Sequence, residues 1–236
     1  AKEAGVEPSK IDEALHNGGE LQNIADKIEE LVKIFGTAGE SAEGGFGGAG
    51  KVSFTDARIL FFPVKSLKGI FQLITCPYVI NRYLEDIKDS NRLNIDLPEG
   101  KALVYSNNFL VEGKILLEEF VFEAEENTEL KRVIDSMPLD EYQKNRVVCI
   151  NDSIFSDMVQ TYTEVQTHIK INPDTGTVSE GALWTAEYLP AESVLYFNLF
   201  FEEQVDFSIT EVFRIGGDIT TGKGFVKVIK AKEVNT

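Results

Sequence analysis

The sequence predicts an α+β fold, and three observations support that class. Near the N-terminus, apolar residues from Leu21 to Phe35 recur at the three- and four-residue spacing of an amphipathic helix. Further along, short apolar or alternating runs are typical of strands. The two kinds of segment do not alternate strictly, as they would in a doubly wound parallel sheet. The order of elements therefore favours α+β.

The composition is that of a globular protein with a real core. The chain has 236 residues, of which 43% are hydrophobic and 26% charged, enough for one large domain or two small ones. No segment reaches the roughly 18 apolar residues of a membrane helix. Cys76 and Cys149 lie far apart in apolar runs, without metal-ligand spacing. We expect both to be buried free thiols in a cytoplasmic protein with no membrane partner.

The charge balance restricts the partners. The formal net charge is −16, and such a field repels nucleic acid at long range. Nucleic-acid affinity normally comes from Lys and Arg side chains that neutralise phosphates. Any contact with RNA must therefore depend on local basic clusters.

Capping residues, glycines and prolines predict the boundaries of the elements. We expect helices at 9–16, 21–35, 66–75, 78–88, 127–137 and 153–162, with Ser66, Asn127 and Asp152 or Ser153 as caps. We expect strands at 51–62, 101–105, 114–122, 146–150 and 194–201, the last of them fully buried, with a hairpin turn at Glu112–Gly113. Residues 36–50 form a glycine-rich loop, in which the G-x-G-x-x-G at Gly45 lacks the strand and helix of a dinucleotide site.

Residues 163–191 predict a β-arm that reaches away from the core. Thr163–Ile171 alternates apolar and polar side chains, Asn172–Gly176 is a turn signal, and Val178–Leu189 returns. His168 on this arm is either an ordinary surface histidine or a stacking or acid–base group. Trp184, the only tryptophan, is either core packing or an exposed aromatic wedge.

Glycines are concentrated between Arg214 and Phe225, where four occur within nine residues. Such a loop lets backbone N–H groups converge on an anion, commonly a phosphate, although a plain hairpin turn has the same pattern. Gly217–Lys223 also matches most of a nucleotide P-loop. That motif needs Ser or Thr after the lysine and then a helix, whereas Gly224 and a strand-like run follow here. We therefore do not expect a nucleotide site.

A second basic stretch surrounds Ser66. If Ser66 caps a helix, Lys65 and Lys68 flank a helix N-terminus, which is a plausible phosphate seat. An ordinary capped helix with solvated lysines is the alternative.

The sequence offers no catalytic constellation. His16 and His168 have no partner at ligand spacing, and no G-x-S-x-G occurs. The acidic cluster of Glu118, Glu119, Glu123, Glu125 and Glu126 is most simply a solvated face. We therefore identify no catalytic residue and no metal ligand in this sequence.

Four stretches together resemble a known family, although any one of them would be weak. They are Gly50–Arg58, Phe62–Gly69, Ile171–Leu183 with Glu187–Glu192, and Ile215–Gly224. In this order, across residues 36–228, they resemble the RAMP superfamily of CRISPR-associated proteins. The resemblance is closest to the repeated backbone subunit of the Cmr-type (type III-B) RNA-guided effector complex.

The resemblance implies a ferredoxin-like (RRM-like) core with helical insertions, formed by residues 1–236 as a single domain. It implies a protruding β-hairpin thumb at residues 163–191, which wedges into the guide–target duplex. The thumb residues that we single out are His168, Lys170, Leu183 and Trp184. It also implies that guide RNA is contacted by Lys65, Ser66, Lys68, Gly216, Gly217, Asp218, Thr221, Gly222 and Lys223.

One part of the family pattern is missing. The family opens with a strand, a loop whose aspartate cuts target RNA with a divalent metal, and a further helix, and nothing in residues 1–236 matches this opening. We therefore expect the domain to lack its opening segment. Magnesium is implied by the resemblance alone, and no cofactor is assigned to this chain.

Three hypotheses about function follow. The first is a backbone subunit that binds guide RNA and target RNA, contacts other effector-complex subunits, and stacks with its own copies as a helical filament. Affinity shared along a filament would make the negative charge tolerable. The alternatives are a stand-alone metal-dependent endoribonuclease and an acidic protein-interaction module without RNA contact.

Overall fold

The computed structural model describes residues 28–29, 31–36, 49–202 and 209–229. The chain divides into two compact units, residues 1–56 with 197–228 and residues 57–196 with 229–236, and each is described by itself. The helix expected at 9–16 and most of the loop expected at 36–50 lie outside the described residues. Of the helix expected at 21–35, residues 28–29 and 31–35 are described and are helical.

The larger unit is built on one seven-stranded sheet. Its strands are β2 (Arg58–Ser66), β3 (Ile70–Thr75), β4 (Lys101–Val104), β5 (Lys114–Leu117), β6 (Phe120–Glu126), β7 (Val147–Cys149) and β10 (Val194–Tyr196). Their order is β10-β2-β3-β7-β4-β6-β5, and β3–β7 and β4–β6 are parallel pairs. Ser66 of β2 also pairs with Leu117 of β5. The sheet therefore curls until a strand near one end meets the strand at the other.

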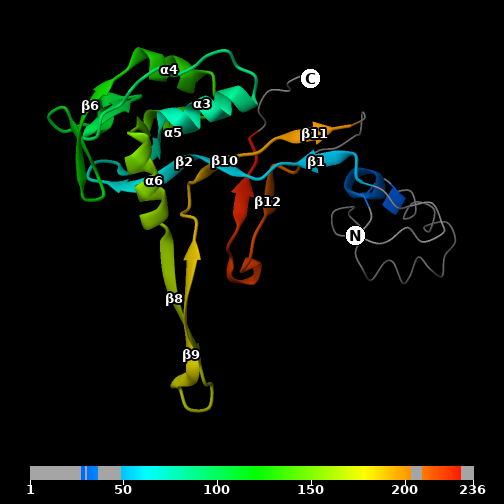
Figure 1. Ribbon diagram of the computed structural model, residues 1–236. Helices are drawn as coiled ribbons and strands as arrows, with labels where there is room; N and C mark the ends of the chain where they lie inside the picture. The colour runs from blue at the N-terminus through cyan, green and yellow to red at the C-terminus, as the bar shows by residue number, and fades with distance from the viewer. Residues whose placement is uncertain (1–27, 30, 37–48, 203–208, 230–236) are drawn as a thin grey trace. The chain divides into compact units, whose positions relative to one another are not determined.

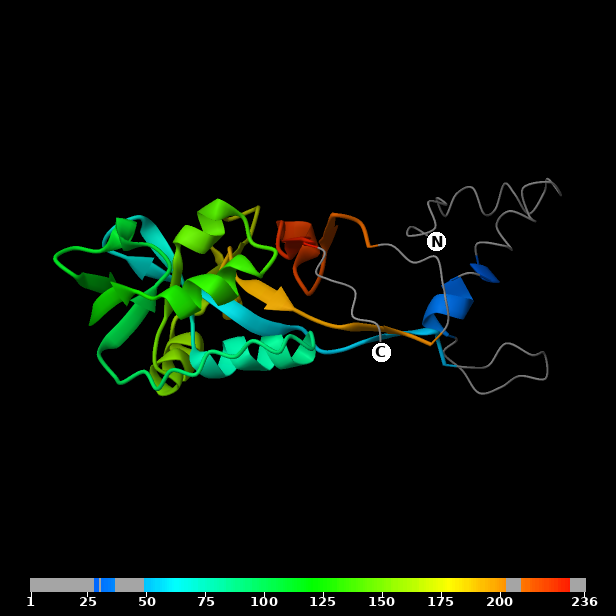
Figure 2. The same ribbon diagram turned by 90° about the horizontal axis from the view of Figure 1, so that it is seen from above.

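Four helices accompany this sheet. They are α3 (Pro77–Asp86), α4 (Thr128–Asp135), α5 (Glu141–Asn145) and α6 (Asp152–Thr161), with a 3-10 turn, η1 (Asn107–Phe109). Helices α3, α4 and α5 lie on one side of the sheet in Figure 1. Seen from above, α3 runs alongside β2 (Figure 2). Apolar side chains of the strands and helices then form one core, which includes Phe61, Phe62, Ile74, Ile80 and Leu130, each fully buried.

Local capping explains where the helices begin. The Asn127 side chain accepts a hydrogen bond from the Leu130 amide at 2.9 Å, which confirms it as the cap of α4. The cap of α6 is one residue earlier than predicted, because the Asn151 side chain accepts from the Ser153 amide. Glu112 and Gly113 both have positive φ, and Val111 and Lys114 bond across them. The predicted turn at Glu112–Gly113 is therefore confirmed.

The helix predicted at 66–75 is wrong: β2 and β3 form a hairpin there, joined by Leu67–Gly69. Gly69, at φ 87°, makes the turn. The last four residues of β3 are buried, and β3 also pairs with β7. A strand buried on both faces is a continuous apolar run, and such a run cannot be told from a helix by periodicity alone.

Three predicted strands are each divided in two. The strand expected at 51–62 forms β1 (Val52–Phe54) in the smaller unit and the first part of β2 in the larger one. The strand expected at 114–122 turns at Glu118, whose φ is 52°, so β5 and β6 pair with each other. The strand expected at 194–201 forms β10 in the larger unit and β11 (Leu199–Phe201) in the smaller one. The full burial expected for it is also wrong, because Phe200 is 52% exposed and Phe201 49%. Strand β11 pairs with β1 and, among the described strands, with no other.

The predicted β-arm is confirmed. Strands β8 (Glu164–Ile171) and β9 (Val178–Tyr188) pair only with each other and project from the larger unit in Figure 1. In the smaller unit, β1 (Val52–Phe54) pairs with β11, and β12 (Val212–Arg214) pairs with β13 (Phe225–Lys227). The predicted α+β class holds, while the grouping of residues 1–236 as a single domain stays a prediction.

Candidate nucleic-acid interface

The glycine-rich stretch is the loop of the β12–β13 hairpin. It runs from Ile215 to Gly224 and contains one 3-10 turn, η2 (Ile219–Thr221). Strand β13, rather than a helix, follows the loop. The nucleotide P-loop reading is therefore excluded, and the site is a glycine-rich hairpin loop.

The loop is held by its own backbone. Asp218 has left-handed φ, at 56°, and its carbonyl oxygen accepts from the amides of Thr221 (3.0 Å) and Lys223 (3.3 Å). The Thr221 hydroxyl donates to the same carbonyl at 2.8 Å. Arg214, which sequence reasoning missed, stacks over the Phe225 ring at 4.0 Å and donates to the Ile219 carbonyl at 3.2 Å. These contacts shape the loop from within one hairpin.

The four glycines of the loop differ in what the fold requires of them. A Cβ on Gly224 would lie 2.0 Å from the Ile215 carbonyl oxygen, so no side chain fits. Gly216 and Gly222 have φ of 89° and 87°, which disfavours other residues. Gly217 has neither a positive φ nor any atom within 4 Å of an added Cβ. The fold therefore does not explain Gly217.

Two backbone amides of the β12–β13 loop have no acceptor among the described residues. The N–H groups of Gly216 and Gly217 donate no hydrogen bond to any described residue. Both residues are exposed, while Lys223 is half-buried. Exposed, unpaired amides on a bare backbone are suited to a close-approaching anion.

The second predicted cluster lies at the β2–β3 turn in the larger unit. Lys65 and Lys68 are exposed, and neither ammonium forms an ion pair with a described residue. The Ser66 hydroxyl, by contrast, is buried and has no hydrogen-bond partner among the described atoms. Because no helix starts here, the proposed seat at a helix N-terminus is wrong. The exposed ammonium groups at this turn are those of Lys65 and Lys68.

The Arg146 side chain holds the β2–β3 turn in place. Its guanidinium donates to the carbonyls of Gly69 (2.7 Å) and Phe71 (2.9 Å). It also lies over the rings of Phe71, Phe109 and Tyr142, at 4.8, 5.0 and 4.2 Å from their centroids. The hairpin end is therefore fixed by side chains from distant parts of the sequence.

One member of the predicted acidic face has a structural role. Glu118 is half-buried; its carboxylate accepts from the Lys65 amide at 2.8 Å, and its own amide donates to the Lys65 carbonyl at 2.9 Å. The other four glutamates are exposed, as predicted. Among these, Glu126 bonds Lys131 at 2.6 Å, and this bond and one from the Asn107 amide lower its pKa. Burial and a hydrogen bond to Glu119 raise the pKa of Tyr162 to about 12.

The thumb residues are on the surface. Trp184 is 51% exposed and Leu183 67%, so core packing of Trp184 is excluded. His168 is paired with Trp184 across the two strands, and their rings stack at 5.5 Å with an interplanar angle of 15°. The Tyr188 hydroxyl, which the sequence did not single out, lies 3.3 Å from His168 Nε2. With exposed Lys170 beside them, these rings form an aromatic face of the thumb, defined here as His168, Trp184 and Tyr188.

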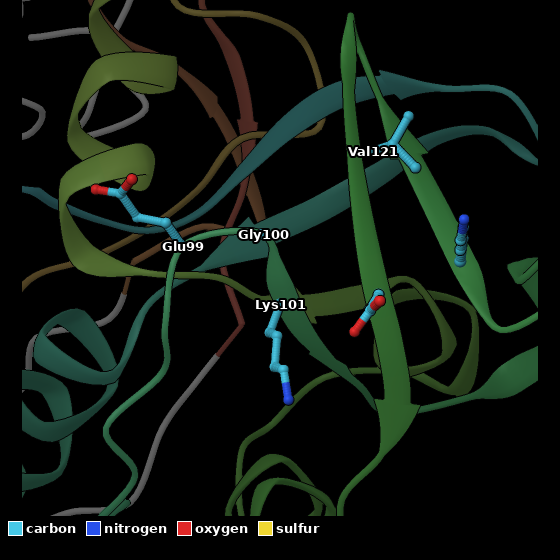
Figure 3. A pocket seen from close by; sticks show the side chains of 6 residues that line it. Glu99, Gly100, Lys101 and Val121 are labelled. Carbon is cyan, nitrogen blue, oxygen red and sulfur yellow. The ribbon is translucent and has the colours of Figure 1, made fainter.

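A hollow of about 400 Å³ lies elsewhere on the larger unit. It is lined by Glu99, Gly100, Lys101, Lys114, Val121 and Glu123. Figure 3 shows the Glu99 and Lys101 side chains leaving the turn at Gly100 in different directions. The hollow is lined by two glutamates and two lysines, and this mixture of charges does not resemble a phosphate-binding site.

The residues that the structure describes do not fit a catalytic metal. In the described ranges, no group of three or more His, Cys, Asp or Glu side chains could hold an ion. We therefore derive no step through magnesium. Within the same ranges, no helix is long and apolar enough to cross a membrane. Cys76 and Cys149 are buried free thiols, as predicted.

Comparison with known proteins gives a consistent answer. The model of the RAMP superfamily matches residues 12–227. The "CRISPR system Cmr endoribonuclease Cmr4" of Pyrococcus furiosus is 34% identical over 237 residues, covering 90% of this chain and 79% of that protein. The crystal structure of oligomeric Cmr4 from Pyrococcus furiosus is similar at 28% identity and TM-score 0.61, covering 84% of this chain and 76% of that one.

The fold is shared more widely. A cryo-EM structure of the type III-B Cmr-beta bound to cognate target RNA matches with a TM-score of 0.66 at 19% identity, over 94% of this chain and 82% of that one. These matches confirm the ferredoxin-like core with its helical insertions. By the match across residues 12–227 and the 34% identity to its relative, the chain belongs to the RAMP superfamily of CRISPR-associated proteins.

Proposed function

We propose that this protein is a repeated backbone subunit of a type III-B CRISPR effector complex, and that its glycine-rich loop binds the backbone of the guide RNA. Family membership and the Cmr4 relatives support the backbone role. The observation that carries the RNA contact is Gly217, a glycine that the fold does not need, whose amide, like that of Gly216, donates to no described residue. A phosphate that closely approaches the main chain explains both features.

The other predicted positions contribute in different ways. Lys65 and Lys68 provide exposed ammonium groups, without an ion pair to any described residue, that would neutralise phosphates. Asp218 and Thr221 shape the loop through the Asp218 carbonyl. The aromatic face of the thumb would stack on bases of the guide–target duplex, since every base offers a π-face to an exposed ring. Sequence reading is then left to base pairing between the two RNAs.

Gly217→Ala tests the loop contact. Because an added Cβ meets nothing within 4 Å, we expect an unchanged melting temperature and a roughly 10-fold weaker affinity for single-stranded guide RNA, about 1.4 kcal/mol. Fluorescence anisotropy measures the affinity. Gly100→Ala, in the other unit and with nothing within 4 Å of an added Cβ, is the control for affinity: its φ of 79° should cost about 1 kcal/mol of stability, while RNA binding should stay normal. Equal affinities for Gly217→Ala and the parent would refute the contact.

Combined Lys65→Ala and Lys68→Ala tests the second cluster. Each phosphate contact adds about 0.9 to the steepness with which affinity falls with salt on duplex DNA, and about 0.7 on a single strand. We expect the slope for single-stranded RNA to drop by about one or slightly more. A slope and an affinity that both stay the same would remove these lysines from the interface.

A further inference from the structure

The end of the β2–β3 hairpin, residues 65–71, is only partly covered by the strands beside it. On the β3 side, strand β7 begins at Val147, which pairs with Leu73, so the first residues of β3 precede it. On the β2 side, strand β5 meets the hairpin at one pair, Ser66 with Leu117. The outward backbone groups next to these pairs therefore need other partners.

Arg146 supplies the partner on the β3 side. It directly precedes β7, and its backbone carbonyl accepts from the Leu73 amide at 2.9 Å. Its guanidinium then reaches the carbonyls of Gly69 (2.7 Å) and Phe71 (2.9 Å). The side chain of Arg146 therefore takes the place of a strand partner along the part of β3 that precedes the first β7 pair.

Glu118 supplies the partner on the β2 side. Its carboxylate accepts from the Lys65 amide at 2.8 Å, and its own amide donates to the Lys65 carbonyl at 2.9 Å. Among the described residues, Glu118 forms no ion pair with Lys65 or Lys68. One acidic residue thus holds both backbone groups of Lys65 without pairing with its ammonium.

The backbone around Lys68 is held as well. The buried Gln72 side chain donates to the Lys68 carbonyl at 3.2 Å. Ile70, two residues further on, has φ 73°, and the Phe71 amide bonds the Gly69 carbonyl at 2.9 Å, so Ile70 is the centre of a strained γ-turn. Such strain persists only where the surroundings enforce it. Here the Arg146 guanidinium bonds the carbonyls on either side of Ile70.

We propose that Glu118 and Arg146 are positioning residues for RNA binding: they fix the backbone that carries Lys65 and Lys68, so that both ammonium groups meet phosphates without first ordering the turn. A lysine ammonium lies at the end of a flexible stem, so the backbone is the part of the contact that the fold can fix in advance. Ordering a loop on binding weakens affinity. This role rests on the proposed contact of the two lysines with guide RNA.

Variants that separate geometry from charge test this role. Arg146→Lys keeps the charge but loses the planar fork, so we expect a roughly 5-fold weaker affinity for single-stranded guide RNA, the scale of ordering one or two residues on binding. Glu118→Ala removes a negative charge, which alone would favour RNA, yet we expect a similar loss because the Lys65 amide loses its acceptor. Glu118→Gln should rescue the affinity, since an amide oxygen accepts the same bond.

Matched controls make the same charge changes elsewhere in the larger unit. Arg132→Lys lies on α4 and Glu125→Ala on β6, both at exposed positions. Neither control should weaken RNA binding. Fluorescence anisotropy measures the affinity, and circular dichroism verifies that each variant is folded at the temperature of the binding experiment. If Arg146→Lys is not folded, the Glu118 pair of variants decides the question by itself.

A second background shows whether the two residues act through the lysines. In a chain that already carries Lys65→Ala and Lys68→Ala, we expect Arg146→Lys and Glu118→Ala to cause no further loss of affinity. Four results would overturn the positioning role: parent affinity in Arg146→Lys and Glu118→Ala, no rescue by Glu118→Gln, an equal loss in the controls, or a further loss in the chain without the lysines.

The same measurements distinguish this role from the proposed function. If the lysine variant binds RNA more weakly but Arg146→Lys and Glu118→Ala bind like the parent, the positioning role is wrong and the lysine contact stands. If the lysine variant itself binds like the parent, the lysine contact and the positioning role are both wrong. Gly217→Ala reports on the β12–β13 loop in either case.

Discussion

The two hairpins predicted to contact RNA are held in different ways. The β2–β3 turn depends on side chains from elsewhere in the chain: Arg146 bonds its carbonyls, and Glu118 bonds the Lys65 backbone. The β12–β13 loop depends on its own residues, through the Asp218 carbonyl and the stacking of Arg214 on Phe225. Both use positive φ at glycine. They differ in where the supporting atoms come from.

This difference predicts which property a substitution changes. A turn supported by distant side chains is coupled to the core, so altering it should lower the free energy of unfolding. A loop supported by its own backbone, with open space around Gly216, Gly217 and Gly222, can change at those positions without disturbing the core. Substitutions in β12–β13 should therefore affect binding more than stability, while those around β2–β3 should affect stability first.

The largest effect is expected for Arg146→Ala. It removes two hydrogen bonds from a charged donor and three ring contacts, and leaves the Gly69 and Phe71 carbonyls without this partner. We expect a loss of about 3–4 kcal/mol in the free energy of unfolding, measured by urea denaturation. Arg146→Lys should recover less than half, because an ammonium cannot reproduce the planar fork. A loss below about 1 kcal/mol would show that the turn is not coupled to the core.

Gly69→Ala should be the next most damaging. An added Cβ would lie 2.4 Å from the Phe109 ring, and φ is 87°. Strain and overpacking together should cost about 2–3 kcal/mol. Gly222→Ala in the other hairpin has the same φ of 87° but nothing within 4 Å, so only the conformational cost of about 1 kcal/mol remains. Equal losses of unfolding free energy in Gly69→Ala and Gly222→Ala would show that the two hairpins do not differ in their coupling to the core.

The same contrast explains what the sequence could and could not predict. The β8–β9 thumb and the hairpin around Gly216–Gly224 were predicted because their signals are local: alternation, a turn sequence and clustered glycines. The β2–β3 hairpin was missed because its strand character comes from pairing with β7 and from burial. Local patterns do not encode a distant partner.

For individual site residues, too, the sequence predicted the properties that depend on local chemistry and missed those that depend on distant partners. The exposure of Lys65 and Lys68 followed from their chemistry, but the burial of the Ser66 hydroxyl did not, since it depends on strand register. The role of Arg146 was not predicted, because the Gly69 and Phe71 carbonyls and the Phe109 ring that it contacts lie 37 or more residues away in the sequence. An arginine just before a buried apolar run would have been the only hint.

Cys76, directly after β3, reports on the base of the supported hairpin. Burial raises the pKa of its thiol to about 12, so at pH 8 only ~1 in 10⁴ molecules carries the reactive thiolate. Alkylation by iodoacetamide in the folded protein should be at least ~100-fold slower than in urea. Because the raised pKa favours the neutral thiol, the stability that it contributes is fully present below about pH 9 and is lost as pH rises toward 12.

A Cys76→Ser variant separates the two buried thiols in that experiment, since it leaves Cys149 as the only cysteine of the chain. Arg146→Ala should accelerate native alkylation at Cys76, if loss of the support lets the hairpin base open. An identical rate in Arg146→Ala and the parent would mean that the turn and its base open independently.

The smallest effect is expected in the thumb, which is held by its own residues, as the β12–β13 loop is, and whose strands pair only with each other. Trp184→Ala removes one ring stacked on His168, but the Trp184 side chain is half exposed and its strands pair only with each other. We expect the free energy of unfolding to change by less than about 0.5 kcal/mol, with the same urea m-value. Thr185→Ala, the neighbouring exposed position, is the control. A loss above about 1.5 kcal/mol for Trp184→Ala alone would show that the thumb is packed against the core, and would place it with the β2–β3 turn rather than with the self-supported loop.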